Sequence, residues 1–391
     1  MQEGDIFRMD NIDKLVEEAN NGNSDALVEL ADKTKCGDGV KQDKEQALLY
    51  YKWAATNGNV NALYKVGLCY EEGCGCEADE KRAFDCMMDA AKKGCVEAIY
   101  KLGYYYDNGI DCEEDKVKAA EYYLEAAKIG YDVAEFALGV CYDIGEGVDE
   151  DTAEAVRWYR EAANQNNPKA EFNLAIKYLN GEGIEEDSEK GLFYMKRAAE
   201  HGIAPAMYNM GMMYYMGLNV EQNMEKAIQY YVDGADKGEV RCQQTLGLIY
   251  ENGDHVEVDL DKAIEYFQMA AKQKDVKSMI HLGDIYLRRG DEEQAMNCYT
   301  LASMYDNDEA IFKLAKILLD KNQPMKARMS VLHHIMDLVE EGYVYAELEY
   351  AKILEEGDLV DKDIEKARKY YKRALDSGLE EARERLKNIE D

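Results

Sequence analysis

The chain has 391 residues, and 80 acidic residues against 47 lysines and arginines give it a formal net charge of -33. This excess argues against nucleic acid or an anionic membrane as partner, because either would be repelled over most of the surface. No apolar run reaches the roughly 18 residues of a spanning helix, and residues 1–23 lack the features of a secretion signal. We expect a cytoplasmic protein, with a monomer as the default state.

The first predicted element is a short helix over residues 15–21, closed by Gly22. Only three prolines occur, and no stretch rich in Gly, Ser or Pro forms a linker. We therefore predict a single repeat domain over residues 1–391. It consists of an N-terminal capping helix within residues 1–25, ten repeats over 26–381, and a C-terminal capping helix over 382–391.

A regular repeat follows this first helix. Small residues recur every 36 positions, which is the signature of a repeat architecture. In the ten repeats, glycine or alanine stands five residues after the small residue, and in most of them a tyrosine stands eight residues after it. These positions share one helical face, so each unit begins with an amphipathic helix, helix A, that carries a small-residue notch for a neighbouring helix. The leading small residues of the regular units are Ala26, Ala62, Ala98, Ala134, Ala170, Ala206, Cys242, Ala346 and, for the last helix, Ala382.

A second helix, helix B, completes each unit. In the fourth unit it is marked by Ala155, by the aromatic residues Trp158 and Tyr159, and by the alanine pair that ends at Ala163. A glycine ends most copies, as is common at helix C-termini. Because neither helix can bury its apolar face alone, the pairs must stack on their neighbours. The sequence thus predicts an all-α solenoid of stacked antiparallel helix pairs.

The loop between helices A and B is rich in glycine and acids, as in "GEGVDED" at residues 145–151. A calcium loop would keep acids at fixed ligand positions, and a phosphate loop would carry a lysine and a hydroxyl residue after the glycines. Neither pattern is kept among the copies, so we interpret the loop as a turn followed by a helix N-cap. The N-cap residues are Asp43, Asp79, Asp115, Asp151, Asp187, Asn223, Asp259 and Asp363.

Two units depart from the regular pattern. Residues 278–309 lack the glycine loop, and residues 310–345 have a short bend, "DKNQP", followed by a lengthened second helix. Whether these units bend the solenoid or form a separate binding surface stays open at this point.

The unit "AEFALGVCYDIGEGVDEDTAEAVRWYREAA" at residues 134–163 resembles the Sel-1-like repeat family, a relative of the tetratricopeptide repeats. It departs from the family pattern mainly in Glu154, where lysine is usual. The resemblance covers nearly the whole chain. It implies a right-handed superhelix that serves as an adaptor or scaffold, and it does not imply catalysis.

In related helical repeats the concave surface is lined by helix A, at positions about two, three, six and ten residues after the leading small residue. We call this surface the helix A face. It carries an aromatic column edged with lysines and amides, which could hold an extended peptide by ring packing and backbone hydrogen bonds; inter-repeat packing and solvation are the alternatives. The predicted partner-binding residues are Tyr64, Lys65, Tyr100, Lys101, Tyr104, Asn108, Phe136, Phe172, Asn173, Asn180, Tyr208, Asn209, Met212 and Asn252.

The remaining candidate chemistry is sparse. Ten cysteines occur, but Cys76 and Cys112 take positions held elsewhere by Val148 or its equivalents, so we expect reduced, partly buried thiols. Cys74 and Cys76 would be the first candidates for a metal site. Adjacent His333 and His334 point about 100° apart on a helix and cannot share a metal ion. We predict no catalytic, cofactor-binding or metal-binding residues and no cofactor.

These observations favour a non-catalytic scaffold that binds a protein or peptide on its helix A face. One alternative is a regulatory subunit that binds a basic partner through its acidic loops. A second is an enzyme-like member of the family that acts on a small molecule such as a peptidoglycan fragment. The partner, the organism and the pathway do not follow from the sequence.

Overall fold

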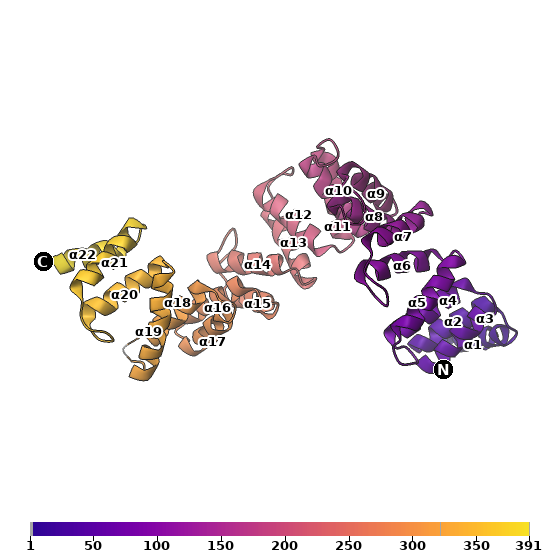
Figure 1. Cartoon of the computed structure of the whole chain (residues 1–391), viewed down its shortest axis with the longest axis horizontal. Coiled ribbons are helices and arrows are strands. Elements are labelled where there is room, and N and C mark those ends of the chain that lie inside the picture. Colours follow the sequence, from indigo (N-terminus) through magenta and orange to yellow (C-terminus); the bar gives the residue numbers. More distant parts are fainter. Residues whose placement is uncertain (1–2, 321, 391) are drawn as a thin grey trace. The chain divides into compact units, whose positions relative to one another are not determined.

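A computed structural model describes residues 3–320 and 322–390 of the chain, and these residues form 22 helices and no strand (Figure 1). The prediction of an all-α solenoid is confirmed. Residues 1, 2 and 391, at the outer ends of the two predicted caps, and residue 321 in the predicted bend lie outside the described residues. The helices form two compact units, Met1–Ala206 and Met207–Asp391, and each is described by itself.

In the first unit each helix packs against the next helix in the sequence. From α2 onward the even-numbered helices are the predicted helices A and the odd-numbered ones are the predicted helices B. The helices are α1 (Glu3–Asn20), α2 (Ser24–Cys36), α3 (Lys44–Thr56), α4 (Val60–Glu72), α5 (Glu80–Lys92), α6 (Val96–Asn108), α7 (Lys116–Lys128), α8 (Asp132–Ile144), α9 (Thr152–Asn164), α10 (Pro168–Asn180) and α11 (Ser188–Glu200).

Helix α12 (Ala204–Met216) contains the boundary between the units, and from α13 onward successive helices of the second unit pack in the same way. These are α13 (Met224–Asp236), α14 (Val240–Asn252), α15 (Leu260–Lys272), α16 (Val276–Arg288), α17 (Glu292–Ser303), α18 (Asp308–Leu318), α19 (Met325–Glu340), α20 (Val344–Glu356), α21 (Ile364–Asp376) and α22 (Glu381–Glu390).

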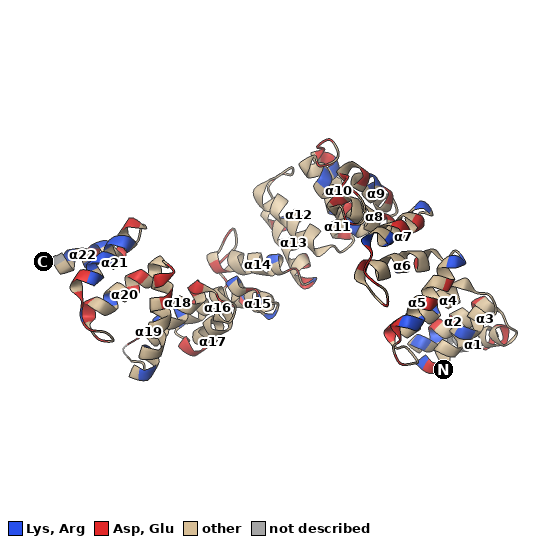
Figure 2. Ribbon diagram, in the orientation of Figure 1, with Lys and Arg blue, Asp and Glu red and all other residues tan. Residues whose placement is uncertain are grey.

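The glycine loop has the turn-and-cap structure that the sequence predicts. In the loop between α8 and α9, Gly145 and Gly147 adopt φ angles of 69° and 75°. The Asp151 carboxylate then accepts hydrogen bonds from the backbone N–H groups of Ala153 and Glu154, each at 3.0 Å. All eight predicted N-cap side chains accept a backbone hydrogen bond in this way. Figure 2 shows acidic residues on these loops, for example after α6 and α20.

In five pairs the glycine notch of helix A receives an aromatic ring from helix B of the same pair, whereas the notch at Gly67 receives Met87. A Cβ atom added to Gly139 would lie 2.7 Å from ring atoms of Tyr159, and one added to Gly103 would lie 2.7 Å from the ring of Tyr123. Both tyrosines are almost completely buried. The glycine therefore sets the distance between the two helices, because any larger residue would collide with the ring.

The ring in the notch ends in a hydroxyl group that reaches the helix A face. Tyr159 donates a hydrogen bond to Asp143 at 3.2 Å, and Tyr299 donates one to Asp284 at 2.6 Å. A buried phenol needs such a partner, and an acid six or nine residues after the leading small residue supplies it. The other pairs of this kind are Tyr51–Asp32, Tyr123–Asp107 and Tyr371–Glu355.

Three segments differ from the regular pair. Helix α1 begins at Glu3, well before the predicted start at residue 15, because its first turns carry no part of the repeat pattern from which the prediction was made. Only residues 289–291 separate α16 from α17, as expected for a unit without the glycine loop. Helix α19 has 16 residues, which confirms the predicted lengthening.

Candidate functional site

Part of the predicted aromatic surface lines a groove in the first unit. Tyr100 and Tyr104 on α6 and Phe136 on α8 border a cavity of about 450 Å³ that extends to the start of α10. Their spacing explains the arrangement, since residues two and six positions after the leading small residue lie on one side of helix A. Of the predicted residues, the groove thus brings these three together.

Two of the three rings are held by packing. The centroid of the Tyr100 ring lies 5.5 Å from that of Tyr123 and 5.6 Å from that of Tyr131, and the Phe136 ring lies 5.9 Å from the Tyr159 ring. Burial raises the pKa of Tyr100, so its phenol stays neutral. Tyr104 is different, because 38% of its surface is exposed. It is the aromatic side chain of this groove that a partner could cover.

Some polar groups of the groove are bonded to other residues of the chain, whereas Lys169 is exposed to solvent. Lys116 places its ammonium 3.0 Å from Asp107 and 3.6 Å from Glu146, so these two lining carboxylates share a counter-charge. Asn167 is occupied, since it caps α10 through the Ala170 N–H and donates to Asp132. Lys169, by contrast, lines the groove and is exposed. The groove therefore has an apolar floor and a cationic group at its edge.

The predicted lysines of the helix A face are held in ion pairs between successive helices A. The Lys65 ammonium lies 2.7 Å from Asp32, and the Lys101 ammonium lies 2.8 Å from Glu71 and over the Tyr104 ring at 4.8 Å. These lysines therefore join successive helix pairs to one another.

The predicted amides on α6 and α10 also make contacts within the chain. The exposed side chains of Asn108 and Asn180 donate to the Tyr104 carbonyl and to Glu182, both at 2.8 Å. Asn173 hydrogen-bonds the Tyr159 hydroxyl, although burial, the larger effect, raises the pKa of that phenol. A partner would have to exchange or share these hydrogen bonds.

The other predicted residues lie outside the groove. Tyr64 and Phe172 are half-buried on α4 and α10, and burial raises the pKa of Tyr64 to about 12. Tyr208, Asn209, Met212 and Asn252 belong to the second unit. There Arg241 stacks over the Tyr208 ring at 4.3 Å, Met212 is half-buried, and Asn252 is exposed.

A Sel1 repeat profile matches the chain nine times, at residues 24–59, 60–95, 96–131, 132–167, 168–203, 204–239, 241–275, 277–304 and 344–379. The chain belongs to the Sel1 repeat family. Each match from the first to the sixth begins with one helix A and ends before the next. Residues 305–343, which lie between the eighth and ninth matches, contain the irregular pair α18 and α19.

Solved structures agree with this assignment. The chain is similar to a protective antigen of uropathogenic Escherichia coli that has this repeat fold, with 26% identity over 96% of this chain and 82% of the other, and a TM-score of 0.75. It is also similar to a Sel1 repeat protein from Oxalobacter formigenes, with 26% identity over 81% of this chain and 94% of the other, and a TM-score of 0.58. A search of curated proteins found no significant match. Sel1 repeat proteins are generally non-enzymatic scaffolds that mediate protein–protein interactions.

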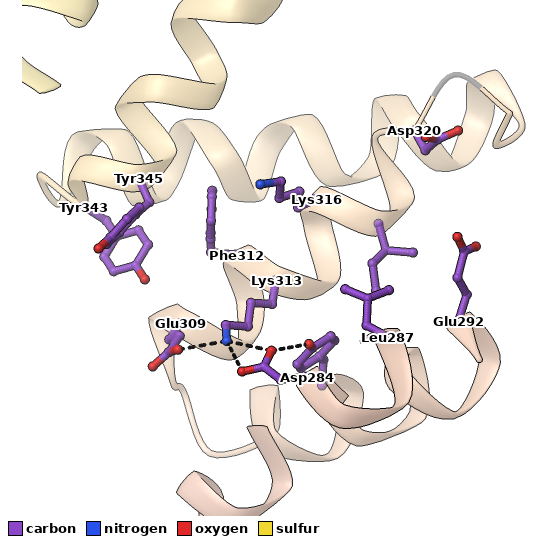
Figure 3. A pocket seen from close by; sticks show the side chains of 12 residues that line it. Asp284, Leu287, Glu292, Glu309, Phe312, Lys313, Lys316, Asp320, Tyr343 and Tyr345 are labelled. Atoms are coloured by element: carbon purple, nitrogen blue, oxygen red, sulfur yellow. Dashed lines mark hydrogen bonds and ion pairs between the residues drawn. The ribbon is translucent and has the colours of Figure 1, made fainter. Parts of the chain in front are cut away.

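Reasoning from the sequence missed another cavity, which lies in the second unit and is lined mostly by residues between the last two Sel1 matches. It has a volume of about 630 Å³ and lies among α16, α17, α18 and the start of α20 (Figure 3). The signal was present, because Phe312, Lys313 and Lys316 stand two, three and six residues after Ala310. These are the positions that define the helix A face in the regular repeats.

Apart from the exposed Cys36, the cysteines pack as buried or half-buried small side chains. All ten carry free thiols, and burial raises the pKa of Cys69 to about 12 and of Cys141 to about 11. The Cys76 and Cys112 thiols take equivalent places, 3.6 Å and 3.5 Å from the carbonyl oxygens of Cys69 and Tyr105. Among the side chains of residues 12–320 and 322–389, no three His, Cys, Asp or Glu residues gather as a metal site would require. Over residues 3–320 and 322–390, no helix combines the length and apolarity needed to cross a membrane.

Proposed function

We propose that this Sel1 repeat chain is a scaffold that binds an extended segment of a partner protein in the groove between α6, α8 and α10. The observation that carries the proposal is the groove itself. Its volume of about 450 Å³ falls in the range of binding pockets, roughly 300–1,000 Å³. Packed rings form its floor, and the exposed Tyr104 stands at its side.

The distribution of side chains supports a peptide as the ligand. Tyr100, Phe136 and Val140 offer apolar surface for partner side chains, and the exposed ammonium of Lys169 can donate to a carbonyl or carboxylate of the bound segment. Because the rings are already fixed by packing against Tyr123, Tyr131 and Tyr159, little side-chain entropy is lost on binding. A pre-organised aromatic floor of this kind favours recognition of a chain segment.

The test uses peptides selected from a random display library against the full-length chain. Tyr104→Ala should weaken binding of the selected peptides by about tenfold or more, the loss expected when an interface aromatic is truncated. Ala137→Trp should block binding by filling the groove, because Ala137 lies on its wall. Phe193→Ala is the matched control, since it removes an exposed ring from α11, a helix B of the first unit that does not line the groove.

Circular dichroism of each variant shows whether its helices are intact. Selected peptides that bind the Ala137→Trp variant as tightly as the wild type would contradict the proposed groove.

A further inference from the structure

The cavity of the second unit has two chemically different ends. Figure 3 shows Tyr343 and Tyr345 on one side and Glu292 and Asp320 on the other. At the aromatic end the ring centroids of Phe312, Tyr343 and Tyr345 are 5.6–6.1 Å apart, so the three rings form one packed wall. Half of the Tyr345 surface remains exposed. This wall offers an apolar partner side chain a surface to cover.

The middle of the cavity is held by a network within the chain. The Lys313 ammonium lies 2.6 Å from an Asp284 oxygen and 3.1 Å from Glu309, and the Tyr299 hydroxyl donates to Asp284 at 2.6 Å. These groups fix α16, α17 and α18 relative to one another. Lys313 already pairs with the carboxylates of this network, so the negative charge available to a ligand lies on the other lining acids.

The charge balance of the lining favours a cationic ligand. Four acids and two lysines line the cavity, which leaves a net charge of -2 (two positive against four negative). Lys313 is committed to the central network, and the Lys316 ammonium lies 3.7 Å from Glu349, a residue outside the lining. Both lining lysines are therefore engaged by acids other than Glu292 and Asp320, the two acids of the acidic end. The net charge of -33 on the whole chain would draw a basic segment toward it.

We infer that this cavity is a second protein-binding site, which selects a partner segment carrying an apolar side chain followed or preceded by an arginine or lysine. The apolar side chain packs on Phe312, Tyr343 and Tyr345, and the basic side chain reaches Glu292 and Asp320. A volume of about 630 Å³ accommodates two such side chains. The site does not depend on the groove of the first unit, because every lining residue belongs to the second unit.

The experiment measures fluorescence anisotropy of labelled peptides with the full-length chain. The peptides have a Gly/Ser background with one tryptophan and one arginine at varied separations. At least one separation should give saturable binding that is lost when the arginine is replaced by glutamate. Binding should also weaken at high salt, since the charges are exposed. No saturable binding at any separation, or equal binding of the arginine and glutamate peptides, would overturn the inference.

Charge variants locate the site. Glu292→Lys and Asp320→Lys should each weaken binding by about fivefold to tenfold, whereas Lys316→Gln should strengthen it because a repelling cation is removed. Glu293→Lys is the matched control, since it makes the same charge change on the next residue of α17, which does not line the cavity. Tyr104→Ala, in the first unit, should leave this binding unchanged even if the groove proposed there fails. Equal losses for Glu292→Lys and Glu293→Lys would show only a long-range charge effect and would overturn the site.

Discussion

At the scale of single residues, the end of helix B requires a left-handed backbone. The second residue after the helix has a positive φ in every regular unit, and it is glycine in most of them, as at Gly238 with φ of 87°. Two regular units use another residue at this point, namely Asn166 and Lys274, and the irregular unit has Asp306 with a positive φ three residues after α17. Asparagine and aspartate tolerate this conformation, but lysine gains nothing from it. Lys274, with φ of 70°, is therefore a point of local strain.

Lys274→Gly should raise the free energy of unfolding by about 0.5–1 kcal/mol, because relief of the left-handed conformation exceeds the extra backbone entropy of glycine. The reverse change, Gly238→Lys, should lower it by a similar amount, although no atom lies within 4 Å of the added Cβ. Urea unfolding followed by circular dichroism measures both. A loss of stability for Lys274→Gly together with a gain for Gly238→Lys would show that charge, rather than backbone conformation, dominates, because the chain has a net charge of -33.

At the scale of the helix pair, the notch and its ring act as one unit. Gly139→Val would push a branched side chain into the Tyr159 ring, which is nearly fully buried and hydrogen-bonded to Asp143. We expect a loss of about 2–3 kcal/mol in the free energy of unfolding, as for other overpacked cores. In a Tyr159→Leu background the same substitution should cost at least about 1 kcal/mol less, because the ring is gone. Additive effects of the two changes in urea unfolding would rule out the ring as the cause.

The repeat period was sufficient to predict these elements, because a position that recurs every 36 residues must occupy the same environment in each unit. Thus the notch at Gly139 and the cap at Asp151 are both present as predicted. Features outside the period were not predictable. The first turns of α1 share no position with a repeat, and Gly147 packs on the Lys116 carbonyl of the preceding pair, a contact that no single unit reveals.

At the scale of the whole chain, the helix A face was predicted as a set of columns of equivalent residues. The role of each column depends on contacts between successive helix pairs. Tyr104 is exposed at a groove, whereas Lys65 and Lys101 are bound to acids about one repeat earlier in the sequence, Asp32 and Glu71. Sequence positions alone could not distinguish a lysine that binds a partner from one that joins two pairs. The cavity at Phe312 was missed for a related reason, since its unit breaks the period that defined the columns.

Salt has two opposite effects on the stability of the folded chain, because it weakens both the repulsion that results from the net charge of -33 and the attraction in the ion pairs between helices A. Repulsion among 80 acids destabilises the folded chain and is screened within about 10 Å at 0.1 M salt. The exposed ion pairs between helices A, such as Lys35–Glu72 at 3.0 Å, lose strength too, but such pairs contribute only about 0–1 kcal/mol each. We therefore expect the melting temperature to rise when sodium chloride is increased from about 0.02 M to about 0.3 M.

Two lysine variants separate the ion pair from the net charge. Lys177→Gln should have a lower melting temperature than Lys169→Gln, which makes the same charge change at an exposed site, and the melting temperatures of both variants should rise with salt. A melting temperature that falls with salt in the wild type would mean that the ion pairs outweigh the repulsion.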